Sequence, residues 1–369
     1  MKKLGFGLMR LPMIEKEVDI EKVKQMVDAF MSKGFTYFDT AWMYCESKSE
    51  SAIKECLVDR YPRDSYTLTT KLPSNQIKSF EDRDRVFNEQ KRRTGLDYFD
   101  YYWLHAVSSQ NIENFDKWQC WDFIKQKKEN GEVKHIGFSY HDGPELLDEL
   151  LNKHPEIEYV QLQLNYLDWL SRNVQSKACY DVCVKHNKPV IVMEPVKGGK
   201  LASLPEEAEE LFKAKNKDMS NASWAIRFAA SLENVYMVLS GMSNAEQMND
   251  NLSYMENFEP LTNDENDLCL KVAEIINKKS AIPCTGCSYC TSVCPQNISI
   301  PQYISLYNAD KQETDSKRHM ANGEEYDNLK KAGTSPQDCL ECGACENICP
   351  QHLEIREHLK KIKGYFEGE

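Results

Sequence analysis

Eight of the fourteen cysteines in this sequence fall into two runs with the same spacing. Both runs read C-x2-C-x2-C-x3-C-P; the first contains Cys284, Cys287, Cys290 and Cys294, and the second contains Cys339, Cys342, Cys345 and Cys349. Two-residue gaps let three thiolates surround one iron–sulfur cubane, and the fourth cysteine of such a run ligates the other cluster. The spacing therefore predicts two [4Fe–4S] clusters.

The exchange of fourth cysteines predicts a ligand set for each cluster. One set is Cys284, Cys287, Cys290 and Cys349, and the other is Cys339, Cys342, Cys345 and Cys294. Zinc sites and disulfides are the alternatives, but zinc uses one or two C-x2-C pairs rather than a third cysteine in step followed by C-x3-C-P. Because iron–sulfur clusters transfer single electrons, this end of the chain is predicted to carry electrons.

Four ionisable side chains in the first third of the chain form a second candidate site. They are Asp39, Tyr44, Lys71 and His105, and each lies at or just past the end of a short apolar segment. In barrels of parallel strands, catalytic groups come from the C-terminal ends of different strands. We therefore expect these four side chains to converge.

Their convergence would produce a proton donor. A phenol ionises near pH 10, so Tyr44 alone is too weak an acid at neutral pH. An adjacent ammonium favours the phenolate, and Lys71, held charged by Asp39, is predicted to lower the pKa of Tyr44. With His105 hydrogen-bonded to the same oxygen, Tyr44 is predicted to act as the general acid for a carbonyl that accepts a hydride.

The order of apolar segments predicts the fold that positions these groups. Between residues 4 and 256, amphipathic helical patterns alternate with eight candidate strands, at 5–8, 36–39, 67–71, 98–104, 135–138, 159–162, 190–193 and 235–239. Such alternation indicates parallel strands with helical crossovers. Eight units in about 250 residues favour an α/β fold of the (β/α)8 barrel type. A doubly wound open sheet is the alternative, although its G-x-G-x-x-G opening is absent.

Three parts of the chain are expected. Residues 1–258 are predicted to form the barrel, 259–280 a linker helix, and 281–369 a small, mostly α-helical ferredoxin-like domain with both clusters. The cysteine runs start 55 residues apart (339 minus 284) and enclose a polar, helix-prone segment. This long spacer resembles that of the α-helical ferredoxin type, which implies a helical domain. Pro301 suits the first turn of a helix there.

Composition narrows the classes of partner. The 369-residue chain has a formal net charge of -12 and no block rich in Lys or Arg, which argues against nucleic acid. No apolar stretch reaches the length of a membrane span, so no membrane partner is expected. Free thiols and clusters need a reducing compartment, which predicts a cytoplasmic protein.

The tetrad and its surroundings resemble the aldo-keto reductase family over about residues 4–256. The matching motifs are Asp39-Thr-Ala-x-x-Tyr44, Lys71, His105, Gly137-Phe-Ser139, Gln161, Asn165 and the segment from Gly241 through Asn251. The whole chain is similar to the subgroup in which this barrel precedes a [4Fe–4S] domain. The resemblance implies an enzyme that reduces a small carbonyl compound, or oxidises an alcohol, with NAD(P)H and with Tyr44 as the acid–base residue.

The resemblance also implies which residues bind the cofactor. Ser139 and Gln161 match positions that hold the nicotinamide carboxamide. The loops after strands seven and eight match the pyrophosphate and adenosine contacts, through Gly198, Gly199, Gly241, Ser243, Gln247 and Asn251. Met193 replaces an aromatic residue that stacks on nicotinamide in many members, and Gln247 replaces an Arg that binds the 2′-phosphate of NADP. The choice between NADH and NADPH is therefore left open.

Three functions are consistent with these features. The first is carbonyl reduction with NAD(P)H coupled to one-electron transfer through both clusters; a flavin is an open alternative for joining two-electron and one-electron steps. In the second, a ferredoxin or other electron carrier supplies the clusters and nicotinamide is not used. The third is a non-enzymatic redox or nucleotide sensor, which an intact proton donor disfavours.

Overall fold

Eight parallel strands close into a barrel in this computed structural model, which describes residues 2–171, 173–279, 281–312 and 316–368. They are β1 (Leu4–Gly7), β4 (Tyr37–Asp39), β5 (Thr67–Pro73), β6 (Phe99–Val107), β7 (Val133–Tyr140), β8 (Tyr159–Gln163), β9 (Val190–Met193) and β10 (Val235–Ser240). Strand β1 pairs with both β4 and β10, and this closes the sheet. The barrel prediction is confirmed, and the largest shift of a predicted strand end is from residue 104 to Val107 in β6.

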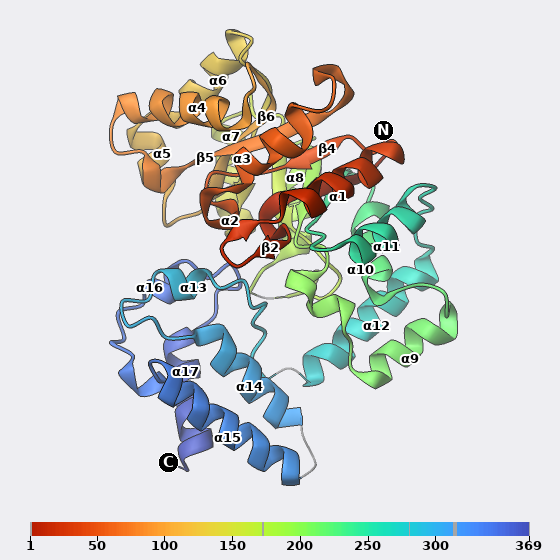
Figure 1. Ribbon diagram of the computed structural model, residues 1–369, viewed down its shortest axis with the longest axis vertical. Helices are drawn as coiled ribbons and strands as arrows, with labels where there is room; N and C mark the ends of the chain where they lie inside the picture. Colours follow the sequence, from red (N-terminus) through yellow and green to blue (C-terminus); the bar gives the residue numbers. More distant parts are fainter. Residues whose placement is uncertain (1, 172, 280, 313–315, 369) are drawn as a thin grey trace.

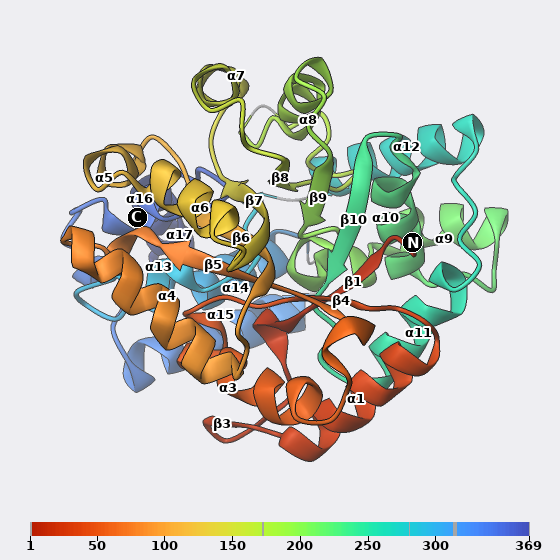
Figure 2. The same ribbon diagram turned by 90° about the horizontal axis from the view of Figure 1, so that it is seen from above.

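Helices surround the barrel (Figures 1 and 2). They are α1 (Ile20–Ser32), α2 (Tyr44–Ser47), α3 (Ser49–Ile53), α4 (Phe80–Thr94), α5 (Ile112–Lys117), α6 (Cys120–Glu129), α7 (Pro144–Lys153), α8 (Ser176–Lys185), α9 (Glu206–Lys215), α10 (Asn221–Ser231) and α11 (Ala245–Met255). Helix α1 shows why the sequence forms them, since its buried residues Val23, Met26, Val27 and Phe30 recur every three or four positions. Asp19 caps its first turn by accepting a hydrogen bond from the Lys22 amide. A short hairpin of β2 (Met13–Ile14) and β3 (Glu17–Val18) follows β1.

Aromatic side chains fill the interior of the barrel. Tyr37, Tyr101 and Trp103 are buried there together with Ile191, Met237 and Leu239. The bulk of Trp103 explains the glycine at position 137, where a Cβ atom would lie 2.6 Å from the indole ring and 2.4 Å from the carbonyl oxygen of Tyr159. The interior is therefore packed, and a ligand has room only at the mouth of the barrel.

The C-terminal part of the chain consists of helices joined by irregular segments, with no strand among its described residues. Helix α12 (Asn263–Lys279) packs on the barrel, with Cys269, Val272 and Ile276 in the barrel core. After it come α13 (Tyr289–Ser292), α14 (Ile300–Gln312), α15 (Ser316–Ala332), α16 (Ala344–Asn347) and α17 (Ile355–Glu367). These helices share a core of their own around Tyr303, Tyr307 and Leu359.

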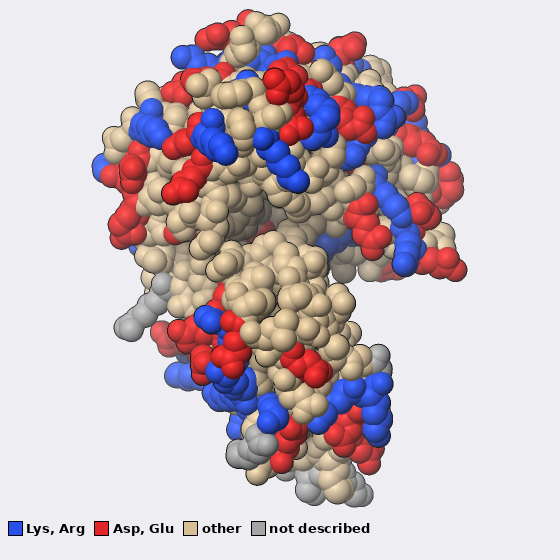
Figure 3. All heavy atoms as spheres, turned by 90° about the vertical axis from the view of Figure 1, so that its left-hand side faces the viewer, with Lys and Arg blue, Asp and Glu red and all other residues tan. Residues whose placement is uncertain are grey.

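The C-terminal helices lie against the mouth of the barrel. Helices α13 and α16 are on the side that faces the barrel, and α15 is farther away (Figure 1). A hollow separates the two parts on one face, and the surface around it is mostly uncharged (Figure 3). None of the helices in the described ranges is long and apolar enough to span a bilayer.

Candidate active site

The four predicted acid–base residues lie together at the C-terminal ends of β4, β5 and β6. Lys71 donates hydrogen bonds to Asp39 Oδ1 (2.6 Å) and to the carbonyl oxygen of Thr40 (2.8 Å). Its Nζ also lies 3.4 Å from the hydroxyl oxygen of Tyr44. The imidazole of His105 approaches the ring of Tyr44 edge to face, with 6.0 Å between the ring centroids. One ammonium group therefore contacts both a carboxylate and a phenol.

A strained turn places Tyr44 beside Lys71. Cys45 and Glu46, which follow Tyr44, have φ angles of 51° and 55°, in the left-handed region. The turn is held from behind, because Ser49 Oγ donates to the carbonyl oxygen of Leu8 (3.0 Å) and lies 2.8 Å from Thr40 Oγ1. The strain is local to the candidate active site, where such conformations are often found.

Burial controls the protonation of the tetrad. It raises the pKa of Tyr44 well above 10, and the carboxylates of Asp39 and Glu194 add to this rise. The prediction that Lys71 lowers the pKa of Tyr44 is therefore wrong, because the loss of water around the phenolate outweighs the nearby ammonium. Burial, with Lys71 second, lowers the pKa of His105 well below 6.5. Tyr44 and His105 are thus both neutral hydrogen-bond donors at neutral pH.

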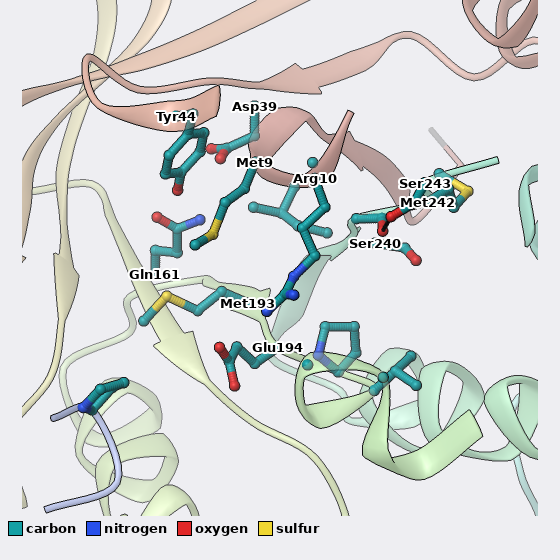
Figure 4. Close-up of a pocket in the computed structure, with 18 of the residues that line it drawn as sticks. Met9, Arg10, Asp39, Tyr44, Gln161, Met193, Glu194, Ser240, Met242 and Ser243 are labelled. Carbon is teal, nitrogen blue, oxygen red and sulfur yellow. Dashed lines mark hydrogen bonds between the residues drawn. The ribbon is translucent and has the colours of Figure 1, made fainter. Parts of the chain in front are cut away.

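A cavity of about 290 Å³ opens beside the tetrad (Figure 4). All of the residues predicted to bind a cofactor line it: Ser139, Gln161, Gly198, Gly199, Gly241, Ser243, Gln247 and Asn251. Tyr44, Asp39 and His105 line the same cavity. The structure therefore brings the predicted cofactor residues and the acid–base residues to one place.

The inner end of this cavity fits a carboxamide group. Ser139 Oγ accepts a hydrogen bond from the Ala106 amide (2.7 Å), which leaves its own hydroxyl proton available. Gln161 Oε1 and Asp39 Oδ2 are buried acceptors without a partner among the described residues. A buried acceptor without a hydrogen bond lowers stability. The NH2 of a carboxamide could donate to these acceptors, and its C=O could accept from the Ser139 hydroxyl.

At the outer end of the cavity, polar side chains form hydrogen bonds with other residues of the protein. Gln247 Oε1 accepts from the Ser243 amide (2.8 Å), and Asn251 Nδ2 donates to Ser240 Oγ (2.7 Å). Gly199 leaves open space where a side chain would be. At Gly198, by contrast, a Cβ atom would lie 2.7 Å from the carbonyl oxygen of Thr285 in the C-terminal part. Glycine at position 198 therefore allows the barrel and the C-terminal part to pack closely.

Several residues that line the cavity are not predicted by the sequence patterns. Arg10, just after β1, extends into it towards Glu194, just after β9 (Figure 4). Glu194 has a φ angle of 55°, and burial raises its pKa. The position of Glu194 directly after β9 was an available signal. Tyr289 also lines the cavity, and its hydroxyl donates to Met9 Sδ (3.6 Å); nothing in a cysteine run indicates that role.

Two smaller cavities in the C-terminal part are each lined by four cysteines. One contains Cys284, Cys287, Cys290 and Cys349, and the other contains Cys294, Cys339, Cys342 and Cys345. We call them the inner and the outer cradle. These are the two exchanged sets that the spacing predicts. Within the described ranges no group of ligands is close enough for a single metal ion. Thiolates spread around a shared cavity fit a cubane better than tetrahedral zinc.

A buried polar network joins the barrel to the inner cradle. Lys197 pairs with Asp168, and it also donates to Oε1 of Gln351 (2.6 Å), which lines the inner cradle. The second carboxylate oxygen of Asp168 accepts from Gln163 and from Asn165, each at 2.9 Å. Both Lys197 and Asp168 are almost completely buried. The loops after β8 and β9 therefore hold the residue next to Pro350 in place.

Comparison with known families gives two matches in this chain. Residues 3–274 match the Aldo/keto reductase family, and residues 283–353 match the 4Fe-4S dicluster domain. The second match supports iron–sulfur clusters at the two cysteine cradles.

Individual relatives match one part or the other. The chain is 32% identical over 95 residues to a component of the ion-translocating oxidoreductase complex of Buchnera aphidicola, covering 26% of this chain and 16% of that protein. It is 24% identical over 208 residues to the 9,11-endoperoxide prostaglandin H2 reductase of Trypanosoma cruzi, covering 55% of this chain and 65% of that protein. The chain thus spans less than two thirds of either curated relative.

The barrel is also similar to solved structures. An aldo-keto reductase from Klebsiella pneumoniae in complex with NADPH superposes with a TM-score of 0.58 at 18% identity, over 74% of this chain and 90% of that one. At this identity the likeness shows the fold.

Proposed function

Because the chain belongs to the aldo/keto reductase family over residues 3–274, we propose that this oxidoreductase reduces the carbonyl group of a small molecule with Tyr44 as the proton donor. The observation that carries the proposal is the position of Lys71 Nζ, 2.6 Å from Asp39 and 3.4 Å from the Tyr44 oxygen. The same residues would serve the reverse oxidation of an alcohol. We expect the reaction in the cytoplasm, since iron–sulfur ligands need reducing conditions.

The residues of the site have distinct parts in this reaction. NAD(P)H, when bound, would supply the hydride that adds to the carbonyl carbon. Ser139 and Gln161 would hold its carboxamide, as their hydrogen-bonding groups suggest. Tyr44 gives its proton to the carbonyl oxygen, and Lys71 stabilises the phenolate that remains. His105, kept neutral by burial, donates a hydrogen bond to the same oxygen.

The cysteine cradles would connect this chemistry to single-electron transfer. Cys342 in the outer cradle is exposed, whereas Gln351 of the inner cradle reaches the buried network at the barrel mouth. We propose that a ferredoxin or similar carrier exchanges electrons at the outer cluster. The inner cluster would pass them towards the barrel.

Replacement of Tyr44 by phenylalanine tests the proton donor. The purified, iron-loaded variant should lose about 100-fold or more in kcat for aldehyde reduction, the usual contribution of a general acid. Tyr140→Phe is the matched control, because the Tyr140 hydroxyl donates to the Gly143 carbonyl outside the tetrad. It should stay within about twofold of the wild type. Equal activity of Tyr44→Phe and wild type would disprove the assigned role.

A second candidate function omits nicotinamide, with the clusters as the source of electrons. It is favoured by Arg10, which extends into the cofactor cavity, and by Met193 in place of an aromatic residue. Anaerobic calorimetry with NADH and NADPH separates the two candidates. Binding of either nucleotide together with nucleotide oxidation by an aldehyde supports the first. Absence of binding with turnover on reduced viologen supports the second.

A further inference from the structure

A second and larger cavity, of about 490 Å³, lies between the barrel mouth and the C-terminal part. The barrel contributes Asn75, Ser108 and Asp142, and the C-terminal part contributes Cys349, Pro350 and Glu354. We call this space the interdomain cavity. Its wall includes Cys349, which also lines the inner cradle. A molecule in this cavity would therefore touch a residue that ligates the inner cluster.

The interdomain cavity meets the cofactor cavity beside the tetrad. Both are lined by His105, His141, Tyr289 and Pro350. The rings of His105 and Tyr44 contact each other edge to face, so a carbonyl group beside His105 at the junction would lie near the proposed proton donor. The hydride source and the carbonyl compound can then occupy adjoining spaces.

The charged side chains that line the interdomain cavity are all acidic within the described ranges. They are Asp142, Glu346 and Glu354, and no Lys or Arg side chain lines the cavity there. Asp142 accepts from the amides of Ser109 and Gly143, each at 2.7 Å. Burial acts to raise the pKa of Asp142, but these hydrogen bonds and the nearby His352 lower it below its usual value. Glu346 is paired with Arg356 (2.7 Å). An anionic substrate would face the carboxylates of Asp142 and Glu354, and no Lys or Arg side chain of the described ranges lines the cavity to offset them, which is unfavourable.

Uncharged hydrogen-bonding groups line the same space. Among the described residues, the side chains of Asn75 and Ser108 have no hydrogen-bond partner that would compete with a ligand. Burial lowers the pKa of His141 to about 4, so its ring is neutral at pH 7. Such groups bind hydroxyl groups well, because a hydroxyl both donates and accepts.

We propose that the interdomain cavity binds the carbonyl substrate, and that this substrate is an uncharged aldehyde or ketone bearing hydroxyl groups. The carbonyl end lies at His105 and Tyr44, and the hydroxyl-bearing end lies towards Asn75 and Ser108. The cysteine-bearing part thereby forms one wall of the substrate site. This inference rests on the proposed carbonyl reduction and specifies its substrate class.

A matched pair of aldehydes tests the substrate class. 4-Hydroxybutanal and succinic semialdehyde have the same chain length and differ in a terminal hydroxymethyl group against a carboxylate. Their kcat/KM values are compared per open-chain aldehyde, because 4-hydroxybutanal closes to a cyclic hemiacetal in water. The iron-loaded enzyme should favour 4-hydroxybutanal in kcat/KM by about tenfold or more, given the like charges in the cavity. Equal values, or a preference for succinic semialdehyde, would overturn the substrate class.

Charge reversal at the cavity wall sharpens the test. Glu354→Lys should reduce the preference by about fivefold, by improving the reaction of succinic semialdehyde. Glu357→Lys is the control, since Glu357 lies in the first turn of the same helix, α17, and does not line the cavity. An unchanged preference in Glu354→Lys would contradict the proposed orientation.

Binding without turnover tests the location independently. Protons of 1,4-butanediol, the alcohol product of 4-hydroxybutanal, should relax faster in NMR when the clusters of Tyr44→Phe are reduced to a paramagnetic state. Asn75→Trp, which fills the cavity, should remove this effect while iron content is unchanged. Relaxation without any carbonyl turnover by the wild type would refute the proposed reaction but keep the binding site. Turnover without this relaxation would refute the site.

Discussion

The phenol of Tyr44 remains protonated because the protein around it and two nearby carboxylates disfavour the phenolate. Burial and two carboxylates, Asp39 and Glu194, raise its pKa well above 10. The role left for Lys71 is to stabilise the phenolate formed after proton transfer, rather than to create phenolate beforehand. A protonated resting phenol is the form that carbonyl reduction requires.

The pH dependence of reduction follows from the directions in which the pKa values of Tyr44 and His105 are shifted. Reduction needs the phenol protonated, so Tyr44 can limit the rate only as pH rises through its raised pKa, above 10. His105 is neutral above its lowered pKa, which is well below 6.5, and charges only as pH falls through that value. We expect kcat/KM to be constant within about twofold from about pH 7 to about pH 9. A decline within that range would show that the Tyr44 phenol, or the Lys71 ammonium whose pKa burial lowers, loses its proton there.

Tyr289 separates the two cavities from the C-terminal side. Tyr289 lines both, and its hydroxyl donates to the sulfur of Met9 at 3.6 Å. Tyr289→Ala should lower kcat/KM by about tenfold, because water would enter the reaction site. Tyr289→Phe should stay within about twofold, since the ring is kept. Both variants should retain the visible absorption of the clusters; equal losses in the two variants would instead assign a role to the hydroxyl.

The loops after β8 and β9 connect the active site to the inner cradle. Lys197 and Asp168 form an ion pair with side-chain exposures of 1% and 4%, and Gln351 joins it from the C-terminal part. Removing one partner of a buried ion pair lowers the stability of the fold strongly, because the remaining charge is buried without a counter-ion. The network therefore fixes how the C-terminal part sits on the barrel.

Removal of Lys197 from its ion pair with Asp168 should destabilise the protein. Lys197→Met should reduce the free energy of unfolding by about 3–5 kcal/mol, since the Asp168 carboxylate would be buried alone. The double variant Lys197→Met/Asp168→Asn should recover much of the loss. Lys177→Met provides the control, because its pair with Asp181 is about half exposed (48% and 55%) and should cost less than about 1 kcal/mol. Anaerobic urea unfolding measures all three.

The molecule as a whole places two cysteine cradles in series with the barrel mouth. Each cradle takes three cysteines from one run and one from the other, so neither run forms a cradle alone. The inner cradle adjoins the interdomain cavity through Cys349, whereas Cys342 of the outer cradle is exposed. This order suits electron entry from a carrier at the outer cradle.

Single cysteine replacements should show that the fourth cysteine of each run ligates the cluster of the other run. Cys349→Ser, although in the second run, should damage the inner cluster, and Cys294→Ser, in the first run, should damage the outer one. Iron content should fall from about eight to about four atoms per chain in either variant. Cys294→Ser should also lose electron uptake from a carrier while NAD(P)H-dependent reduction persists. Loss of the same cluster from both variants would contradict the exchanged arrangement.

Sequence alone determined the barrel strands, the convergence of Asp39, Tyr44, Lys71 and His105, and the two cysteine sets. Strand positions and ligand spacing are local patterns, so residue types and their separations are enough to predict them. Gly198 shows the limit of this reasoning. Its resemblance to a phosphate-binding position is a local property, whereas its contact with Thr285 depends on a distant part of the chain.

Only the tertiary structure decided the protonation of Tyr44, the places of Arg10 and Tyr289, and the wall of the interdomain cavity. Each depends on packing between segments far apart in sequence, such as Lys197 against Gln351. No periodic pattern encodes such contacts, because they arise only when two separately folded cores meet. Burial then sets the pKa of a group through the water it excludes, and a sequence does not state where water is excluded.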